Sequence, residues 1–204
     1  METNVSTVIV VTGASRGIGK AIALSLAAPD TALIINCSKS AGRLELVKEE
    51  IIKKGALCET FVGDVSNYST VNEMFDLAIS IYGKVNVLIN NAGIASIGLF
   101  QDMTPDMWNN IMSVNLNSVY NCCHFAVQDM LRRHCGKIIN ISSVWGLYGA
   151  SCEVAYSATK GAINSFTKAL AKELAPSNIQ VNAIACGAID TEMNGHLSPE
   201  ELQN

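Results

Sequence analysis

Six short runs of apolar and β-branched residues are spaced along the chain, and each is predicted to form a β-strand. Most of these runs are continuous rather than alternating, which is typical of strands that are buried on both faces of a parallel sheet. The predicted strands are residues 7–11, 32–37, 57–62, 85–90, 137–142 and 180–186.

Segments of helical length separate the runs, and Ile18, Ile22 and Leu26 show the helical spacing of apolar positions in the first of them. The predicted helices are residues 17–28, 41–54, 68–82, 105–133 and 153–174. Helices that alternate with strands supply the crossovers of a parallel sheet, so the pattern predicts an α/β fold. At 204 residues, the chain fits a single domain over residues 1–204.

A glycine-rich turn, TGASRGIG from Thr12 to Gly19, joins the first predicted strand to the first helix. Gly13 permits a tight turn, Gly17 lets the backbone approach a pyrophosphate, and Gly19 allows close helix packing. The helix N-terminus adds free N–H groups and a partial positive charge. The alternative is that the glycine-rich segment only connects the strand to the helix and binds no ligand. With the right-handed crossover rule, a dinucleotide site here favours a Rossmann-like doubly wound sheet of order 3-2-1-4-5-6.

Tyr156 and Lys160 are four residues apart on a predicted helix and therefore share one face. An ammonium beside a phenol favours the ionised phenol, so Lys160 is expected to lower the pKa of Tyr156. Ser143 precedes Tyr156 by 13 residues, near the end of a predicted strand. Together with the glycine-rich turn, these residues indicate hydride transfer.

Composition narrows the class of protein. The 14 basic and 18 acidic residues form no basic stripe, which argues against nucleic acid or an anionic membrane as partner. No signal peptide or membrane-spanning pattern is present, so we expect a soluble, cytoplasmic protein. Seven scattered cysteines without a Cys-x-x-Cys pair favour a reducing compartment, and three histidines without ligand spacing predict no metal site.

Read together, these motifs resemble the short-chain dehydrogenase/reductase family over essentially the whole chain. The motifs that carry the resemblance are Thr12 to Gly19, Asn90-Asn91-Ala92-Gly93, Asn115, Ser143, Tyr156 and Lys160. The segments INISSVWG and AYSATKGAI are most similar to the branch that reduces 3-oxoacyl groups on acyl carrier protein.

The resemblance implies four catalytic residues. Ser143 would hydrogen-bond the substrate carbonyl oxygen, and Tyr156 would deliver the proton. Lys160 would lower the pKa of Tyr156 and bind the nicotinamide ribose, and Asn115 would anchor a water on a proton path to Lys160. Ser142 is the rival of Ser143, and the family's spacing to the tyrosine selects Ser143.

The resemblance also implies a cofactor site. Its residues would be Gly13, Ser15, Arg16, Gly17, Ile18, Gly19, Lys39, Asp64, Val65, Asn91, Ala92, Gly93, Tyr156, Lys160, Ile189 and Thr191. Asp64 and Val65 would contact the adenine, and Thr191 would bind the nicotinamide carboxamide. Asn90 and Asn91 have a structural alternative, because amides in this segment brace the central strand.

The choice between the two nicotinamide cofactors depends on the 2′ position of the adenosine ribose. No Asp or Glu occurs between Thr31 and Arg43, where an NAD site usually supplies an acid for the 2′-hydroxyl. Arg16 and Lys39 are cations for a 2′-phosphate instead, although Lys39 is about equally well explained as a solvated surface charge. We therefore expect NADP(H), with NAD(H) as the alternative.

Two features depart from the family pattern. Cys186 stands where a proline is common, so a looser turn and a thiol are expected beside the nicotinamide. The chain ends at Asn204, just after residues 196–201, where helices that cover the substrate would begin. We therefore expect a C-terminally truncated domain that lacks the usual seventh strand, with an exposed sheet edge.

The implied function is NADPH-dependent reduction of a 3-oxoacyl thioester to the 3-hydroxyacyl thioester in fatty-acid synthesis. The substrate would be a small-molecule or carrier-bound carbonyl compound, and a homo-oligomer is expected, a tetramer in the full-length family. A dehydrogenase of another small alcohol, ketone, sugar or steroid is the runner-up, and a non-catalytic dinucleotide-binding module is the third candidate. Arg132, Arg133 and His134 either dock an acidic carrier protein or compensate a helix dipole.

Overall fold

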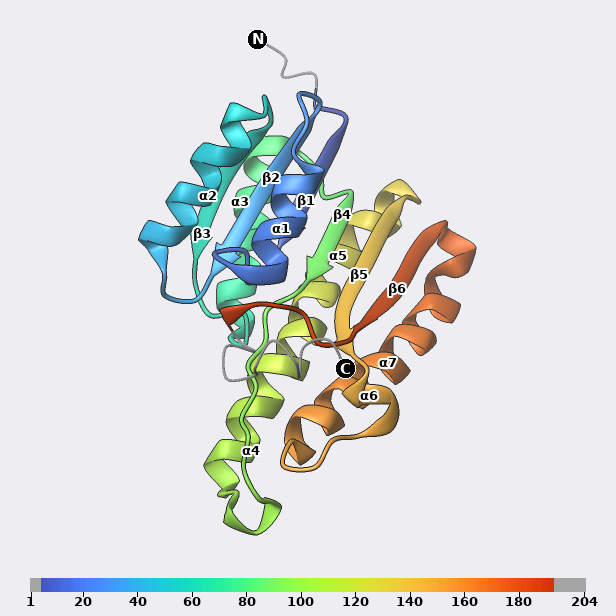
Figure 1. The fold of residues 1–204 in the computed structure, drawn as a ribbon. Coiled ribbons are helices and arrows are strands. Elements are labelled where there is room, and N and C mark those ends of the chain that lie inside the picture. The colour runs from blue at the N-terminus through green and yellow to red at the C-terminus, as the bar shows by residue number, and fades with distance from the viewer. Residues whose placement is uncertain (1–4, 193–204) are drawn as a thin grey trace.

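The computed structural model of the chain describes residues 5–192, which form a parallel six-stranded sheet with helices on both faces (Figure 1). The strand order is β3-β2-β1-β4-β5-β6, so the predicted doubly wound sheet is confirmed. The strands are β1 (Thr7–Val11), β2 (Thr31–Cys37), β3 (Leu57–Val62), β4 (Val87–Asn90), β5 (Gly136–Ser143) and β6 (Ile179–Cys186). The order reverses between β1 and β4, which is where such sheets bind their ligands.

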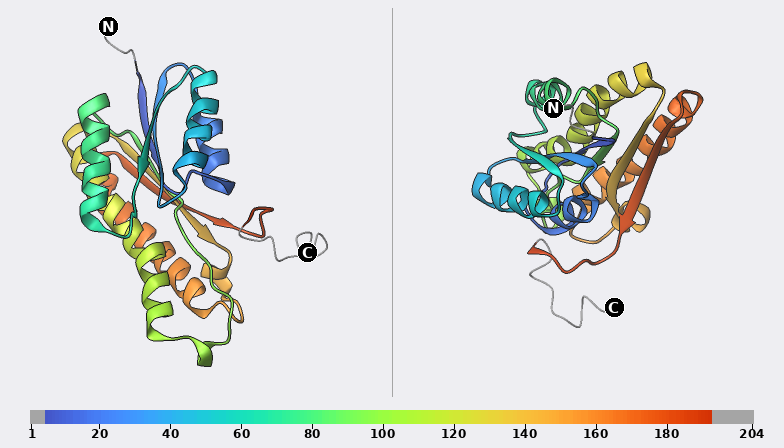
Figure 2. Two further views of the ribbon diagram at one scale, coloured as in Figure 1. Left: turned by 90° about the vertical axis from the view of Figure 1, so that its left-hand side faces the viewer. Right: turned by 90° about the horizontal axis from the view of Figure 1, so that it is seen from above.

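Each face of the sheet has its own core. Helices α1 (Gly17–Leu26) and α2 (Ala41–Lys53) pack on one face, around buried residues that include Leu33 and Leu44. Helices α3 (Tyr68–Tyr82), α5 (Ser118–Arg133) and α7 (Val154–Leu174) cover the other face, as the two side views show (Figure 2). The strands are apolar on both faces because both faces are covered.

The long helix predicted over residues 105–133 is interrupted. It consists of α4 (Pro105–Met112), a π-helical turn η2 (Ser113–Asn117) and α5. Thr104 caps the start of α4 by accepting a hydrogen bond from the N–H of Met107 at 3.2 Å. Single π-helical turns are rare and often lie at functional sites, and this one contains the buried Asn115.

Buried amides brace the centre of the sheet. Asn90, which ends β4, donates to Oδ1 of Asn140 on β5 at 2.9 Å, and Asn140 donates to Oγ1 of Thr167 on α7 at the same distance. Because these groups are buried and paired, the chain of amides joins two strands and a helix. Asn90 therefore braces the central strand, which is the structural role considered for it in the sequence analysis.

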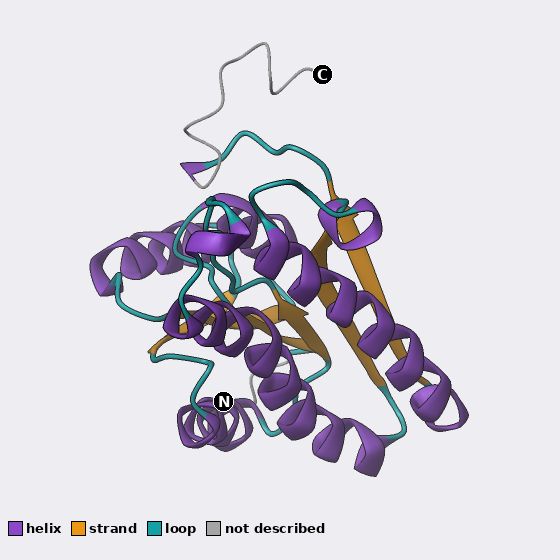
Figure 3. Cartoon of the chain, turned by 90° about the horizontal axis from the view of Figure 1, so that it is seen from below, coloured by secondary structure: helices purple, strands orange, loops and turns teal. Residues whose placement is uncertain are grey.

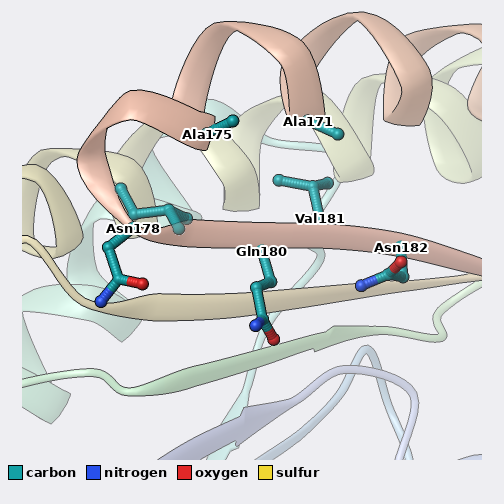
Figure 4. Close-up of a pocket in the computed structure, with 7 residues that line it drawn as sticks. Ala171, Ala175, Asn178, Gln180, Val181 and Asn182 are labelled. Carbon is teal, nitrogen blue, oxygen red and sulfur yellow. The ribbon is translucent and has the colours of Figure 1, made fainter.

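Among the described residues, β6 has a neighbouring strand on one side only. An open hollow of about 540 Å³ lies between β6 and α7, and Val181 points towards the helix there while Gln180 points to the opposite face (Figure 4). A second hollow of about 330 Å³ lies nearby, between α7 and the later part of β6. Neither hollow is lined by Ser143, Tyr156 or Lys160.

The predicted start of the substrate-covering helices, residues 196–201, lies outside the described residues. Within residues 5–192, no helix has both the length and the apolar character that crossing a membrane requires. Short elements that the sequence pattern did not predict are η1 (Phe100–Asp102), α6 (Trp145–Tyr148) and η3 (Ala175–Ser177).

Candidate active site

The glycine-rich turn lies where β1 passes into α1, at the carboxyl edge of the sheet. Gly13 and Gly17 have φ angles of 63° and 55°, in the left-handed region that favours glycine. A Cβ atom on Gly13 would lie 2.9 Å from Cα of Ala92, and one on Gly19 would lie 2.4 Å from the carbonyl oxygen of Gly13. Gly13 and Gly19 are therefore required by the packing of the turn itself.

Thr12 and Asn91 hold this turn against the loop that follows β4. The Thr12 hydroxyl accepts hydrogen bonds from the N–H groups of Asn91 at 3.0 Å and Ala92 at 3.1 Å. In return, the Asn91 side chain donates to the carbonyl oxygens of Thr12 at 3.0 Å and Gly13 at 3.1 Å. The Asn91 amide thus braces the turn, and Thr12 is a positioning residue that the sequence analysis did not single out.

The first turn of α1 is arranged to receive an anion. Arg16 is its N-cap residue, the first turn contains no acidic residue, and no side chain of the described residues caps it. A Cβ atom on Gly17 would lie 3.6 Å from the Thr191 side chain, so the turn faces the segment after β6 across a narrow space. The predicted residues Ser15, Gly17, Ile18 and Thr191 therefore lie around the positive end of one helix.

Asp64 and Val65 follow β3 at the same edge of the sheet. Asp64 is exposed, and its carboxylate accepts a hydrogen bond from the N–H of Ser66 at 2.9 Å. Asn121 of α5 donates to the carbonyl oxygens of Val65 at 3.1 Å and Ser66 at 3.0 Å. The sequence analysis missed Asn121, because nothing in the spacing of α5 marks which of its polar residues faces this loop.

The structure separates the two rival serines. Ser143, the last residue of β5, is hydrogen-bonded to the Tyr156 phenol and accepts a hydrogen bond from the N–H of Trp145 at 3.1 Å. Ser142 donates instead to the carbonyl oxygen of Lys160 at 3.3 Å and is buried. Ser142 therefore fixes the turn of α7 that carries Lys160, and Ser143 is the serine beside the tyrosine.

Lys160 is buried beneath the tyrosine. Its ammonium donates to the carbonyl oxygen of Ile141 at 2.8 Å and lies 5.5 Å from the centre of the Tyr156 ring. Burial lowers the pKa of Lys160 to about 8. A Cβ atom on Gly146 would lie 2.6 Å from the Lys160 carbonyl carbon, so α6 also packs closely on this turn of α7.

The pKa of Tyr156 does not follow the expectation from sequence. Burial raises it, and this effect outweighs the hydrogen bond from Ser143, which lowers it. Lys160 directs its ammonium at the Ile141 carbonyl oxygen and over the face of the phenol ring, rather than at the hydroxyl group. The expectation of a lowered pKa for Tyr156 is therefore wrong for the chain without a cofactor.

Asn115 is fully buried in the π-helical turn. Its Oδ1 accepts from the N–H of Ile94 at 2.8 Å, and its Nδ2 donates to the Ile94 carbonyl oxygen at 2.9 Å and to Thr159 at 3.3 Å. A Cβ atom on Gly93 would lie 3.3 Å from Asn115 Oδ1 and 3.8 Å from Lys160 Nζ. Asn115 and Lys160 therefore border the same glycine, and only Oδ1 of the amide keeps hydrogen-bonding capacity.

Beyond the glycine turn, two arginines meet a carboxylate. Arg16 Nη1 lies 2.6 Å from a carboxylate oxygen of Glu192, and Arg43 Nη1 lies 2.9 Å from the same oxygen. Hydrogen bonds from Arg16 and then Arg43 lower the pKa of Glu192. Arg43 and Glu192 were not among the predicted site residues. Lys39 is exposed and forms no ion pair within residues 5–192.

The loops that carry these residues gather at the carboxyl ends of the strands, and the segment after β6 crosses that end of the sheet (Figure 3). A family model described as short chain dehydrogenase matches residues 7–202 of this chain. The chain belongs to the short-chain dehydrogenase/reductase family. The resemblance stated from the motifs is thereby confirmed.

Individual members of the family are similar over most of the chain. A 3-oxoacyl-[acyl-carrier-protein] reductase of Synechocystis is 38% identical over 195 residues, which are 96% of this chain and 79% of that protein. The reductase FabG of Staphylococcus aureus, with the same description, is 40% identical over 190 residues, or 93% and 77% of the two chains. The structure of an NAD⁺-bound xylitol dehydrogenase is 31% identical, with a TM-score of 0.86 over 92% of this chain and 72% of that one.

As a short-chain dehydrogenase/reductase, the chain is an NAD(P)-dependent oxidoreductase, and its residues fit a nicotinamide dinucleotide. The positive end of α1 and Arg16 suit phosphate groups. Gly93 leaves room beside Lys160 and Asn115, and a larger residue there would press on the Asn115 amide. Ile189 is exposed on the segment after β6.

Cys186, the departure from the family's proline, ends β6 directly opposite Ser143 of β5. Its carbonyl oxygen accepts from the N–H of Val144 at 2.9 Å, so the turn after β5 depends on its backbone. Burial raises the pKa of the Cys186 thiol, and the nearby Lys160 charge lowers it. The thiol therefore lies within electrostatic reach of the Lys160 ammonium.

The basic cluster at the end of α5 is partly internal. Arg133 donates to the Asp129 carboxylate at 2.9 Å and to the Val85 carbonyl oxygen, and only about a quarter of its side chain is exposed (25%). Arg132 is mostly exposed, at 68%. Of the two arginines considered for docking a carrier protein, only Arg132 presents its charge to solvent.

Proposed function

We propose that this chain is an NADPH-dependent 3-oxoacyl-[acyl-carrier-protein] reductase that forms the 3-hydroxyacyl thioester. The observation that carries the proposal is the grouping of Ser143, Tyr156 and Lys160 at the end of β5, next to the glycine-rich turn. Similarity to two reductases of that description over more than nine-tenths of the chain supports the choice of substrate.

Ser143 and Tyr156 act on the substrate carbonyl group. When bound, the nicotinamide cofactor supplies the hydride. Both hydroxyl groups donate hydrogen bonds to the carbonyl oxygen, which orients the carbonyl and stabilises the negative charge that develops there. Because burial raises the pKa of Tyr156, its phenol is protonated near neutral pH and can donate its proton to that oxygen.

Lys160 and Asn115 form the path by which protons reach Tyr156. The Lys160 ammonium uses one of its three hydrogens on Ile141, and the other two remain for the cofactor ribose and for a water. The free capacity of Asn115 Oδ1, beside Gly93, suits the same water. Lys160, with its pKa near 8, can then pass protons towards Tyr156 at neutral pH.

NADP(H) is the proposed cofactor. Arg16 at the glycine turn and the absence of an acid between Thr31 and Arg43 support it, because a 2′-phosphate needs cations where an NAD site has a carboxylate. The xylitol dehydrogenase with a similar fold is described as NAD⁺-bound, so NAD(H) is the alternative that binding measurements must compare.

We also propose a homo-oligomer in a reducing, cytoplasmic setting. Large apolar side chains are exposed among the described residues, including Phe100 at 63% and Tyr148 at 83%, and a second subunit would cover such groups. All seven cysteines are free in the structure. Light scattering on the purified chain measures the assembly directly, and a monomer at micromolar concentration would contradict this part of the proposal.

Turnover of carbonyl substrates tests the proposed activity. Acetoacetyl thioesters of acyl carrier protein and of pantetheine are compared with small ketones, sugars and steroids by the loss of NADPH absorbance. Preference for the carrier-bound thioester supports the proposal, and preference for a sugar or ketone favours the runner-up dehydrogenase. Tight NADPH binding without turnover of any carbonyl compound would indicate the non-catalytic module.

A further inference from the structure

Glu153 places a carboxylate beside Tyr156, the proposed proton donor. It is the N-cap residue of α7, and Tyr156 is the third residue of that helix. Side chains at these two positions lie close enough to interact, as they do in a capping box. Burial raises the pKa of Tyr156 most, the Ser143 hydrogen bond lowers it, and the charge of Glu153 raises it further. Glu153 therefore acts on the group that meets the substrate carbonyl.

The backbone of Glu153 is held by hydrogen bonds. Its N–H donates to the carbonyl oxygen of Ala150 at 3.3 Å, and its carbonyl oxygen accepts from the N–H of Ser157 at 2.9 Å. The Ser157 hydroxyl in turn accepts from the N–H of Ala150 at 3.1 Å. Cys152, directly before Glu153, has a φ of 62°, and its carbonyl oxygen accepts from the N–H of Gly98 at 2.9 Å. The half-buried carboxylate is thus attached to a fixed point at the start of α7.

The titratable groups of the described residues around the Tyr156 phenol come from α7 and β6. Lys160 is buried below the ring, and its ammonium donates to a backbone carbonyl oxygen. Burial raises the pKa of the Cys186 thiol on β6, so this group is uncharged near neutral pH. Glu153 is therefore the anion that a substrate meets beside Tyr156.

A carbonyl group that accepts hydrogen bonds from Ser143 and Tyr156 lies close to Glu153. A fixed carboxylate repels a second negative charge, more strongly where water is partly excluded. We propose that Glu153 is a specificity-determining residue that excludes substrates with a negative charge close to the reacting carbonyl, and so selects neutral 3-oxoacyl esters and thioesters over free 3-oxo acids. The inference rests on the proposed function for the reaction at Ser143 and Tyr156, and it adds the charge of the acyl substrate.

The same carboxylate affects the direction of the reaction. Reduction uses the protonated phenol of Tyr156, whereas oxidation of the 3-hydroxyacyl product uses the phenolate. Because Glu153 raises the pKa of Tyr156, it favours the protonated form and therefore reduction at neutral pH. Removal of the charge lowers this pKa, so that oxidation begins at a lower pH.

Two substrates that differ in charge test the selectivity. Acetoacetate carries a carboxylate next to the carbon that adjoins its reacting carbonyl, and ethyl acetoacetate carries a neutral ester there. Glu153→Gln removes the charge and keeps the size of the side chain. It should raise the ratio of kcat/KM for acetoacetate to kcat/KM for ethyl acetoacetate by about fivefold or more. Glu153→Lys should raise this ratio further, because its ammonium attracts the carboxylate.

Glu173→Gln is the matched control, because it removes the same charge from an exposed position near the other end of α7. It should change neither the ratio nor the dependence of oxidation on pH. With ethyl 3-hydroxybutyrate as the substrate for oxidation, the pH profile of Glu153→Gln should shift to lower pH than that of wild type. A role of Glu153 in folding alone would not shift this profile.

The outcomes separate this inference from the proposed function. A wild-type chain that reduces no carbonyl compound contradicts the proposed function, and the inference with it. Reduction of acetoacetyl thioesters, with the same ratio in wild type, Glu153→Gln and Glu173→Gln, contradicts the inference alone. A lower ratio in Glu153→Gln would also overturn it, because Glu153 would then assist the anionic substrate. A raised ratio with an unchanged pH profile would overturn it as well, because the lost charge must act on Tyr156 too.

Discussion

Ser143 and Ser142 are neighbours on one strand, yet their different surroundings give them different roles. The side chain of Ser143 meets the Tyr156 phenol, and that of Ser142 holds the backbone of Lys160. Alternation along β5 puts the two hydroxyl groups on opposite faces, so one lies beside Tyr156 and the other beside the backbone of Lys160. Burial acts on the two titratable groups in opposite directions, because it raises the pKa of Tyr156 and lowers that of Lys160.

The first prediction concerns the proton donor. Tyr156→Phe should lower kcat by about 10²–10⁴-fold, because it removes the general acid, while NADPH affinity changes little. Tyr120→Phe, on a half-exposed tyrosine of α5, is the control and should keep full activity. A Tyr156→Phe chain that retains more than about a tenth of wild-type kcat would rule out Tyr156 as the proton donor.

The second prediction concerns the cost of burying Lys160. Its pKa falls from 10.5 to about 8 on folding, so Lys160→Met should abolish turnover yet raise the free energy of unfolding at pH 7 by about 1–3 kcal/mol. Between pH 8 and 10.5 the unfolded chain binds more protons than the folded chain. Wild-type stability should therefore rise with pH in that window relative to the variant.

Denaturant titrations at several pH values measure this difference. The gap between Lys160→Met and wild type should narrow as the pH rises from 8 towards 10.5. A variant that is less stable than wild type at pH 7 would show that the Ile141 hydrogen bond outweighs the burial of the charge.

At the scale of elements, the sequence pattern predicted the strands, but it did not predict the interruption of the helix expected over residues 105–133. Continuous apolar runs predicted all six strands within a few residues, because both faces of the sheet are covered. The π-helical turn at Ser113–Asn117 has no such signal, since it depends on Asn115 reaching Ile94 in another segment. Arg43, Glu192 and Asn121 were missed for the same reason, because their partners lie far away in the sequence.

The third prediction tests the contact between α6 and α7. Gly146→Ala should lower the free energy of unfolding by about 1–3 kcal/mol, because its Cβ would lie 2.6 Å from the Lys160 backbone. It should also lower kcat, since the turn that carries Lys160 must shift. Gly42→Ala, where a Cβ meets no atom within 4 Å, is the control and should leave both unchanged or stability slightly higher. Equal effects of the two substitutions would contradict the close contact.

At the scale of the molecule, the site joins the two halves of a doubly wound sheet. The glycine turn belongs to β1 and α1 on one face, and Tyr156 and Lys160 belong to α7 on the other. Thr12 and Asn91 connect the two across the point where the strand order reverses. The residues proposed to bind the pyrophosphate and those proposed to move the proton therefore lie on different faces of the sheet.

At the opposite end of the sheet, the carboxylate of Asp129 holds α5 in place. Asp129 of α5 accepts from the N–H of Val85 at 3.0 Å and from Arg133 at 2.9 Å, and so ties the end of α5 to the start of β4. Burial acts to raise the pKa of Asp129, but the hydrogen bonds from Arg133 and Val85 outweigh it, and the pKa lies below its ordinary value. The stability that Asp129 contributes is therefore present above its unfolded pKa of 3.8 and is lost as the pH falls through the folded value.

The last prediction follows from this dependence of stability on pH. Asp129→Ala should lower the free energy of unfolding at pH 7 by about 1–3 kcal/mol, because the Val85 N–H and the Arg133 guanidinium lose their partner. The difference from wild type should shrink as the pH falls below 3.8, because the unfolded wild-type chain then binds a proton at Asp129 that the folded chain binds only at lower pH. Asp76→Ala on α3, whose carboxylate accepts only from the exposed Asn72 among the described residues, is the control. Urea denaturation from pH 2 to 7 measures both variants, and a pH-independent loss in Asp129→Ala would mean that packing, rather than the charge, holds α5 to β4.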